Sequence, residues 1–353
     1  MRTKWSVSKM VISTVLSAGH LLSLGTVTAA PAPYSYYTHG NATDVSTATS
    51  FGEVFMGGST DVDEAFVWMS EKANGGDFLI LRASGTDAYN PYIYDLAQTA
   101  GTPLNSVNTL IVNDLAIAGS HSFVIDKINH AEAIFFAGGN QADYVNFLKG
   151  TPALDALNNR IAQGIPFGGT SAGLAIQGEH SYDAIATKSK TLDSPTALNN
   201  PYNSLISLTH GLIETPVNGH LITDSHFEQR DRMGRFLTFL ARNIQDGFEA
   251  ADQAKGMAVN EMTALLVEQD GTATVVVQPG ATNPGVYMAQ SNQAPSVCQN
   301  GTPLTFTNIS IYKLTEGDSF NLNTWTGSGG LSYSVNVNNG VVTSSTGNIY
   351  GTE

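Results

Sequence analysis

The stretch at residues 165–173, IPFGGTSAG, joins an apolar strand-like run to a glycine-rich turn around Ser171. Small residues on both sides of a serine allow a strained turn between a buried strand and a helix, which lifts the hydroxyl clear of the sheet. The N–H groups that open the following helix would stabilise negative charge on a substrate oxygen at the same spot. The pattern is typical of a serine hydrolase's nucleophile elbow, although a glycine-rich turn with an unreactive serine has the same letters.

Apolar runs on both sides of this turn predict an α/β fold. Strand-like runs occur at residues 52–56, 77–82, 108–112, 133–137 and 166–167, with helical patterns between them, as at 62–73. Buried strands that alternate with helices predict a mostly parallel, doubly wound sheet covered on both faces. Glycines follow four of these strands, so we expect them at the strand-end edge where sites assemble in such sheets: Gly58, Gly85, Gly139 and Gly169.

After residue 268 the sequence changes to β-branched runs at 272–277, 304–314 and 331–342, separated by turn signals. This region is too short for most sandwich modules, so we expect its strands and hairpins to pack on the α/β layer. The predicted organisation is a signal peptide over residues 1–30, an α/β domain over 31–325 that is β-rich from about 269, and a C-terminal β extension over 326–353.

The first thirty residues have the layout of a secretory signal. Three basic residues precede an apolar run at 10–24, and small residues stand before Pro31. The run is interrupted by polar residues and is shorter than the ~20 residues of a membrane-spanning helix. We therefore expect a secreted protein, extracellular or periplasmic, with no membrane partner.

Charge and cysteine content exclude several functions. The net charge is −14, and without the leader's three basic residues 13 basic residues face 30 acidic ones, which argues against nucleic-acid binding. Cys298 is the sole cysteine in the sequence, so an intramolecular disulfide is excluded and we expect a buried, inert thiol. The histidines lack paired ligand spacing, so the sequence predicts no metal or other cofactor.

A nucleophilic serine needs a base, and imidazole is the side chain best suited to accept its proton near neutral pH. Of the eight histidines, His226 stands out because it ends a strand-like run and directly precedes a helix expected over 228–243. The others expected in the mature chain lie in polar or mixed contexts: His39, His121, His130, His180, His210 and His220.

The third member should be a carboxylate that orients the imidazole. Glu261 lies in the strand-like apolar run 257–267, where burial of its charge is costly unless it is paired. Asp224 competes, but it is two residues from His226 and would point to the same face of a strand, which suits substrate contact better. The order Ser, His, Glu differs from that of the lipases and esterases of the α/β-hydrolase fold, where the acid precedes the histidine.

Other candidate site residues follow from position. The backbone N–H groups of Gly139 and Ala172 would form an oxyanion hole, and Gln141 would line the pocket. Arg232 and Arg235 are one helical turn apart and share a face. They either form surface salt bridges with the surplus carboxylates or make a fork for a substrate carboxylate.

These blocks resemble the cyanophycinase family of serine peptidases, which is related to the aspartyl dipeptidases and has a class I glutamine-amidotransferase-like α/β fold. The resemblance spans residues 51–320 or so, and its motifs are 136–141 (FAGGNQ), 169–173 (GTSAG), 224–235 (DSHFEQRDRMGR) and 260–264 (NEMTA). It implies that Ser171 is the nucleophile, His226 the general base and Glu261 its orienting partner. It also implies substrate-pocket roles for a further set of residues: Gln141, Asp224, Ser225, Arg232 and Arg235.

The resemblance implies a substrate as well. Family members cleave cyanophycin, a poly-aspartate backbone with an arginine on each β-carboxyl, into β-aspartyl-arginine dipeptides. Ser225 and Asn140 depart from the family, because cytoplasmic members commonly have glutamine at the first position and often an acidic residue at the second. The alternatives are a peptidase for other aspartyl or isoaspartyl peptides and a non-catalytic extracellular binding protein. The expected partner is the polymer or a related peptide, and a homodimer is left open.

Overall fold

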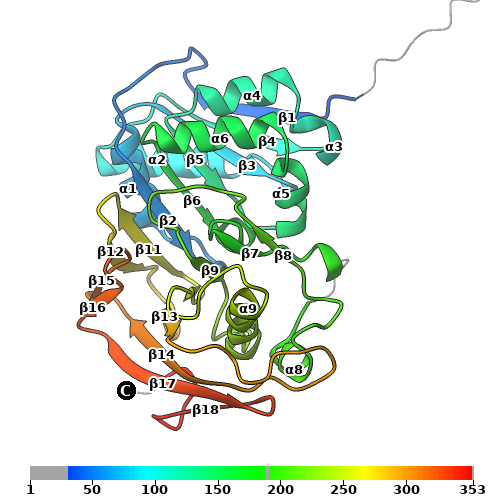
Figure 1. The fold of residues 1–353 in the computed structure, drawn as a ribbon. Helices are drawn as coiled ribbons and strands as arrows, with labels where there is room; N and C mark the ends of the chain where they lie inside the picture. The colour runs from blue at the N-terminus through cyan, green and yellow to red at the C-terminus, as the bar shows by residue number, and fades with distance from the viewer. Residues whose placement is uncertain (1–30, 188–190, 352–353) are drawn as a thin grey trace, which may run out of the picture. The chain divides into compact units, whose positions relative to one another are not determined.

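The computed structural model describes residues 31–187 and 191–351 of the chain. The predicted signal peptide over residues 1–30 lies outside the described residues. From residue 32 onward the chain forms one compact unit, built on two β-sheets with helices around them (Figure 1).

The first sheet has a parallel centre and antiparallel flanks. Its strands are, in spatial order, β1 (Tyr34–Gly40), β4 (Ser106–Val112), β3 (Asp77–Arg82), β5 (Ala133–Phe136), β6 (Pro166–Thr170), β2 (Gly52–Met56), β11 (Thr263–Glu268), β12 (Thr272–Val277), β15 (Ser319–Asn321) and β16 (Thr326–Ser328). The five strands from β4 to β2 run parallel. The other strands join antiparallel. The parallel centre confirms the α/β fold.

Helices cover both faces of this sheet. One face carries α1 (Asp63–Ala73) and α2 (Tyr89–Ala100), and the other carries α3 (Leu115–Ala118), α4 (Ser122–Asn129), α5 (Gln141–Leu148), α6 (Pro152–Ala162) and α7 (Ala172–Ala175). The alternation of β2 shows why: Val54 and Met56 pack with Phe66 of α1, whereas Phe55 packs in the cluster that holds Leu157 of α6. A strand with two apolar faces needs cover on both sides.

The second sheet was not anticipated from the sequence. Its spatial order is β18 (Val341–Ser344), β17 (Leu331–Asn338), β14 (Phe306–Leu314), β13 (Val286–Ser291), β10 (Lys255–Val259), β9 (Leu221–Asp224), β7 (His180–Tyr182) and β8 (Leu208–His210). The connecting segments hold η1 (Ile185–Thr187), α8 (Ser194–Asn199) and α9 (Met233–Gln245). Residues after 268 therefore extend both sheets.

The second sheet also has two buried faces. Met257 and Met288 pack in the same cluster as Val267 and Phe320 of the first sheet. On its other face, α9 inserts Phe236 and other apolar side chains against the strands. Cys298 is buried there, as expected, and burial raises the pKa of its thiol to about 12. None of the described helices combines the length and apolar character that a membrane crossing requires.

Two local predictions were wrong. The helix expected over 228–243 begins only at Met233, because residues 226–231 form turns in which Asp231 has a positive φ of 48°. Glu261 does not lie within a strand: β10 belongs to the second sheet and β11 to the first, so the chain must cross between sheets at Asn260–Met262, and Met262 has a φ of 56°.

Candidate active site

Ser171 occupies a strained turn between β6 and α7. Its φ of 55° and ψ of −109° are unfavourable for any residue with a Cβ atom. The Ser171 N–H donates to the carbonyl of Met56 on β2 at 3.0 Å, which holds the turn against the neighbouring strand. A Cβ at Gly173 would meet the Phe136 carbonyl oxygen at 2.1 Å, so only glycine lets α7 pack directly on β5. The elbow expected from the sequence is present, although its helix is a single short turn.

His226 comes from the second sheet, two residues beyond the end of β9. Its N–H donates to the Gly57 carbonyl at 2.9 Å, which ties it to the end of β2 in the first sheet. Gly58 has a φ of +106°, and a Cβ there would lie 2.3 Å from Cε1 of the imidazole. The imidazole of His226 thus packs directly against the backbone of Gly58. The sequence had identified Gly58 only as a glycine that follows a strand.

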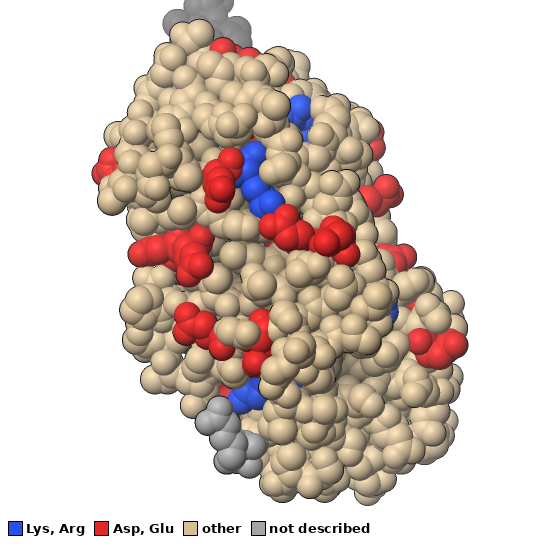
Figure 2. Space-filling model, turned by 90° about the vertical axis from the view of Figure 1, so that its left-hand side faces the viewer, with Lys and Arg blue, Asp and Glu red and all other residues tan. Residues whose placement is uncertain are grey.

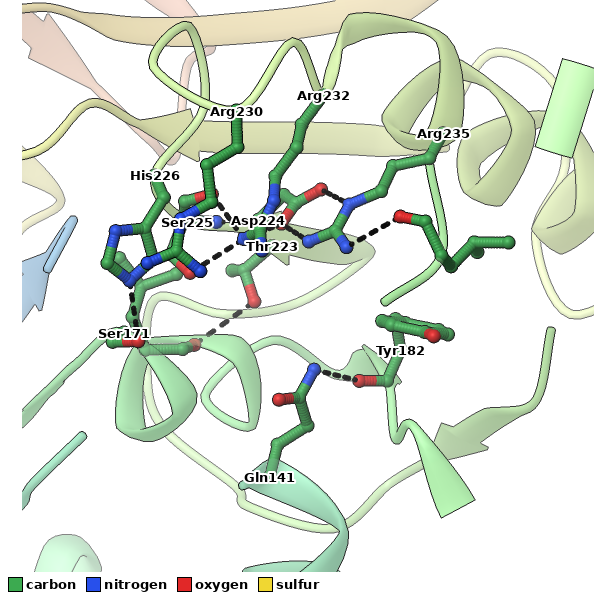
Figure 3. Close-up of polar contacts among 12 residues, drawn as sticks. Gln141, Ser171, Tyr182, Thr223, Asp224, Ser225, His226, Arg230, Arg232 and Arg235 are labelled. Carbon is green, nitrogen blue, oxygen red and sulfur yellow. Dashed lines mark hydrogen bonds and ion pairs between the residues drawn. The ribbon is translucent and has the colours of Figure 1, made fainter. Parts of the chain in front are cut away.

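Glu261 reaches the other side of the same imidazole from the crossover between the sheets. His226 Nδ1 donates to Glu261 Oε1 at 2.6 Å. On the opposite side of the ring, Ser171 Oγ donates to His226 Nε2 at 2.7 Å (Figure 3). The Glu261 N–H is held by Gln229 Oε1 at 3.0 Å. The three residues proposed from sequence are therefore brought into one hydrogen-bonded chain at the junction of the two sheets.

The electrostatic surroundings favour a neutral imidazole. Burial and the positive charges of Arg230 and Arg232 hold the pKa of His226 below its usual value, against the opposing effect of Glu261. The neutral ring donates from Nδ1 and keeps a lone pair on Nε2 that faces the serine hydroxyl. This is the protonation state that a general base needs.

The oxyanion-hole candidates lie around Ser171. Ala172 directly follows the serine, and a Cβ built on Gly138 would be 3.5 Å from the Ser171 Cβ, so the glycine pair after β5 runs beside the serine. Gly139 has a φ of +156° and lines the adjoining pocket.

This pocket has a volume of about 260 Å³. Its walls are polar and basic: Gly139, Asn140, Gln141, Tyr182, Ala184, Thr187, Thr191, Leu192, Arg230, Arg232 and Arg235. Gln141 is placed by a hydrogen bond from Nε2 to the Tyr182 carbonyl at 3.3 Å, and Asn140 caps α5 by accepting from the Ala142 N–H at 3.2 Å. A second pocket of about 250 Å³ lies against α4, and its lining does not include Ser171, His226 or Glu261.

Asp224 lies behind this pocket and organises its arginines. Arg235 makes a bidentate pair with it, at 2.8 Å from Nε to Oδ2 and 2.5 Å from Nη2 to Oδ1, and Arg232 Nη1 lies 3.4 Å from Oδ1. Burial alone would raise the pKa of Asp224, but the two guanidinium groups hold it below its ordinary value. Both arginines are buried, so the alternative of surface salt bridges is wrong for them.

Ser225 supports Arg232 rather than lining the pocket. Its carbonyl accepts from Arg232 Nη1 at 2.7 Å, and its buried hydroxyl lies 3.4 Å from the same nitrogen. Arg232 keeps its buried Nε without a hydrogen-bond partner among the described residues. Burial and the nearby Arg235 lower the pKa of Arg232 to about 10, so it stays charged at neutral pH.

Sequence analysis missed Arg230 and Tyr182. The side chain of Arg230 is 50% exposed, its Nε lies 3.7 Å from Glu261 Oε1, and it lines the pocket beside Arg232. The signal for it in the sequence was its place in the motif at 224–235. Tyr182 belongs to β7, which no sequence pattern had indicated.

Comparisons with known proteins identify the family of this chain. A model of peptidase family S51 matches residues 47–275. The chain is 27% identical over 239 residues to a cyanophycinase from Synechococcus elongatus, covering 67% of this chain and 66% of that protein. It is 28% identical over 197 residues to a cyanophycinase from Trichormus variabilis, covering 56% and 59%. The chain thus matches somewhat less than two thirds of the length of these relatives.

Two solved structures show a more distant likeness. A peptidase from an acI-B1 actinobacterium aligns with a TM-score of 0.47 at 13% identity, covering 78% of this chain and 98% of that one. A putative peptidase E protein from Listeria monocytogenes aligns with a TM-score of 0.41 at 16% identity, covering 65% and 98%.

Proposed function

The chain belongs to peptidase family S51, and on that premise we propose that it is a secreted serine exopeptidase that hydrolyses cyanophycin to β-aspartyl-arginine dipeptides. The observation that carries the proposal is the hydrogen-bonded chain Ser171–His226–Glu261 beside a pocket rich in arginine. The cyanophycinases among its relatives supply the substrate class.

In this mechanism Ser171 is the nucleophile. His226 Nε2 accepts the hydroxyl proton as Oγ attacks the scissile carbonyl, and Glu261 stabilises the imidazolium that forms. The N–H groups of Gly139 and Ala172 stabilise the oxyanion. The leaving amine takes the proton from His226, and a water molecule activated by the same imidazole then hydrolyses the acyl-enzyme.

The charge of the pocket supports recognition of a carboxylate. Figure 2 shows a face on which acidic side chains clearly outnumber basic ones, in keeping with a net charge of −14. In the pocket, by contrast, the three arginines Arg230, Arg232 and Arg235 form salt bridges with two carboxylates of the described residues, Asp224 and Glu261. A local excess of positive charge in an acidic protein suits an anionic group of the substrate.

The decisive experiment compares the purified protein with its Ser171→Ala variant on insoluble cyanophycin, with soluble products identified by mass spectrometry. We expect β-aspartyl-arginine from the parent, and a rate lower by roughly four orders of magnitude or more in the variant. Ser296→Ala, at an exposed serine, is the matched control and should keep full activity.

A second readout separates the mechanism from the substrate. Covalent labelling of Ser171 by an organofluorophosphate probe requires the activated serine but no particular substrate. Labelling without any dipeptide release would overturn cyanophycin as the substrate and direct the assay to other β-aspartyl peptides. Absence of both, with binding to the polymer retained, would favour the non-catalytic binding protein.

Secretion is the remaining part of the proposal. It is supported by the basic, apolar and small-residue order of residues 1–30. N-terminal sequencing of exported protein should find a start near Ala30, and recovery of the full chain inside cells alone would contradict export.

A further inference from the structure

A second polar cluster lies at the far ends of the elements that carry the pocket. Glu179 directly precedes β7, His220 directly precedes β9, and Glu249 follows α9. One potential ligand atom from each of these residues lies within 4.8 Å of the other two. The three positions are far apart in the sequence, so the spacing of the histidines could not reveal them.

The carboxylates of this cluster are held in fixed orientations. The Glu249 side chain is 6% exposed, and its Oε2 accepts from His220 Nδ1 at 2.8 Å. The Glu179 carboxylate accepts from the His220 backbone N–H at 2.6 Å. Glu249 thus contacts the imidazole of His220 and Glu179 contacts its backbone N–H, and the His220 side chain is 45% exposed and open to an incoming ion.

Two histidines, the buried His180 and the half-buried His210, support Glu249 from behind. His180 Nε2 donates to Glu249 Oε1 at 2.7 Å, and His180 Nδ1 lies 2.8 Å from His210 Nδ1. Since His180 donates from Nε2, its other ring nitrogen, Nδ1, accepts a hydrogen bond from Nδ1 of His210. Burial and the proximity of His180 lower the pKa of His210 to about 4, which keeps it neutral. Such hydrogen bonds behind a carboxylate are the arrangement that orients metal ligands.

We propose that Glu179, His220 and Glu249 bind a divalent transition-metal cation, for which Zn²⁺ is the best fit. One imidazole nitrogen with two carboxylates suits zinc better than Ca²⁺ or Mg²⁺, which prefer oxygen ligands alone. Zinc takes such donors at about 2.0–2.2 Å, so adjacent ligand atoms would stand roughly 3.3 Å apart. A small rotation of His220 reaches this from the present 2.8 Å, and the ring proton moves from Nδ1 to Nε2, so that the Nδ1 lone pair can bind the ion.

The site would brace the substrate pocket from a distance. β7 carries Tyr182, β9 carries Asp224, and α9 carries Arg235, so the three ligands connect the elements on which the pocket is built. Along β9, His220 and Asp224 are about 13 Å apart at the usual rise per residue. The ion therefore acts on stability, and the proposal does not rest on the peptidase reaction.

The test uses untagged protein stripped with a chelator, then titrated with zinc chloride in a calorimeter and melted with and without the metal. We expect one equivalent of bound Zn²⁺, a higher Tm, and much weaker binding of Ca²⁺. His220→Ala and Glu179→Gln should abolish the stoichiometric binding, and His180→Ala should weaken it by about 10–100-fold. Circular dichroism of each variant establishes that it is folded.

Two controls make the outcome specific. His130→Ala removes an exposed histidine that pairs with Asp126, and it should bind zinc like the parent. His226→Ala should also bind zinc normally, because the ion is not held by the triad. Zinc binding that survives in His220→Ala but is lost in His226→Ala would overturn the site, as would equal affinity for Ca²⁺ or no saturable binding. None of these readouts depends on cyanophycin hydrolysis.

Discussion

At the scale of single residues, Arg230 tunes the base of the proposed triad. Its positive charge lowers the pKa of His226. In Arg230→Gln we expect the pKa of His226 to rise by a few tenths of a unit, because the charge is half exposed and partly screened by solvent. The neutral imidazole is then lost at a higher pH, so the acid limb of the pH profile for Ser171 labelling should move upward.

Arg242→Gln is the matched control for this prediction. Arg242 pairs with Asp246 at the end of α9 and does not line the pocket. The pH profile for Ser171 labelling in Arg242→Gln should coincide with that of the parent at low salt. A profile for Arg230→Gln that stays in place or moves to lower pH contradicts the assigned role.

Glu53 makes the stability of the protein depend on pH. It is fully buried on β2, and neither carboxyl oxygen has a hydrogen-bond partner among the described residues. Burial raises its pKa from 4.5 to about 8, so the folded protein keeps the carboxyl neutral while the unfolded chain ionises it. Between these two values the unfolded state binds fewer protons, and stability falls as pH rises.

The Glu53→Gln variant should lack this loss of stability at rising pH. Relative to the parent, the variant gains about 1.4 kcal/mol in the free energy of unfolding per pH unit across that window, up to roughly 4 kcal/mol near pH 8. Urea unfolding at a series of pH values measures the difference. Glu268→Gln, which alters a half-exposed carboxylate paired with Lys72, should show no comparable trend. If the free energies of unfolding of Glu53→Gln and the parent change in parallel with pH, the buried carboxyl of Glu53 is not neutral in the folded protein.

At the scale of elements, the contact between β9 and α9 depends on one carboxylate. Asp224 at the end of β9 neutralises Arg235 and Arg232, all three of them buried. Asp224→Asn leaves two buried guanidinium groups without their counter-charge, so we expect a loss of about 3–5 kcal/mol in the free energy of unfolding. Asp246→Asn, in the more exposed pair with Arg242, should cost under about 1 kcal/mol. Equal effects in chemical denaturation would contradict the assignment of β9 and α9 to a charge-linked unit.

At the scale of the whole molecule, the candidate site exists because two sheets meet. Ser171 follows β6 of the first sheet, His226 follows β9 of the second, and Glu261 lies on the crossover between β10 and β11. Met257 and Phe320, from different sheets, share one buried cluster, so burial of apolar surface fixes the separation of the two sheets. The short hydrogen bonds of the chain Ser171–His226–Glu261 therefore depend on packing far from the site.

Much of this was predictable from local patterns. The apolar runs at 52–56 and 77–82 coincide with β2 and β3, because a strand buried on both faces reads as a continuous apolar run. The β-branched run at 272–277 coincides with β12. The glycines around Ser171 reveal the elbow, since the strained backbone and the close approach of α7 to β5 demand small residues. The strands and the serine turn depend on residues that are neighbours in the chain, so local sequence patterns predict them.

The sequence by itself determined the α/β class, the serine turn and the three residues of the hydrogen-bonded chain. Only the tertiary structure decided that β7, β9 and the C-terminal strands form a second sheet, that Glu261 lies at a crossover, and that Asp224 serves the arginines behind the pocket. It alone gathered Glu179, His220 and Glu249. The physical reason is that pairing of strands and burial of charge depend on partners distant in the chain, and no local pattern encodes such partners.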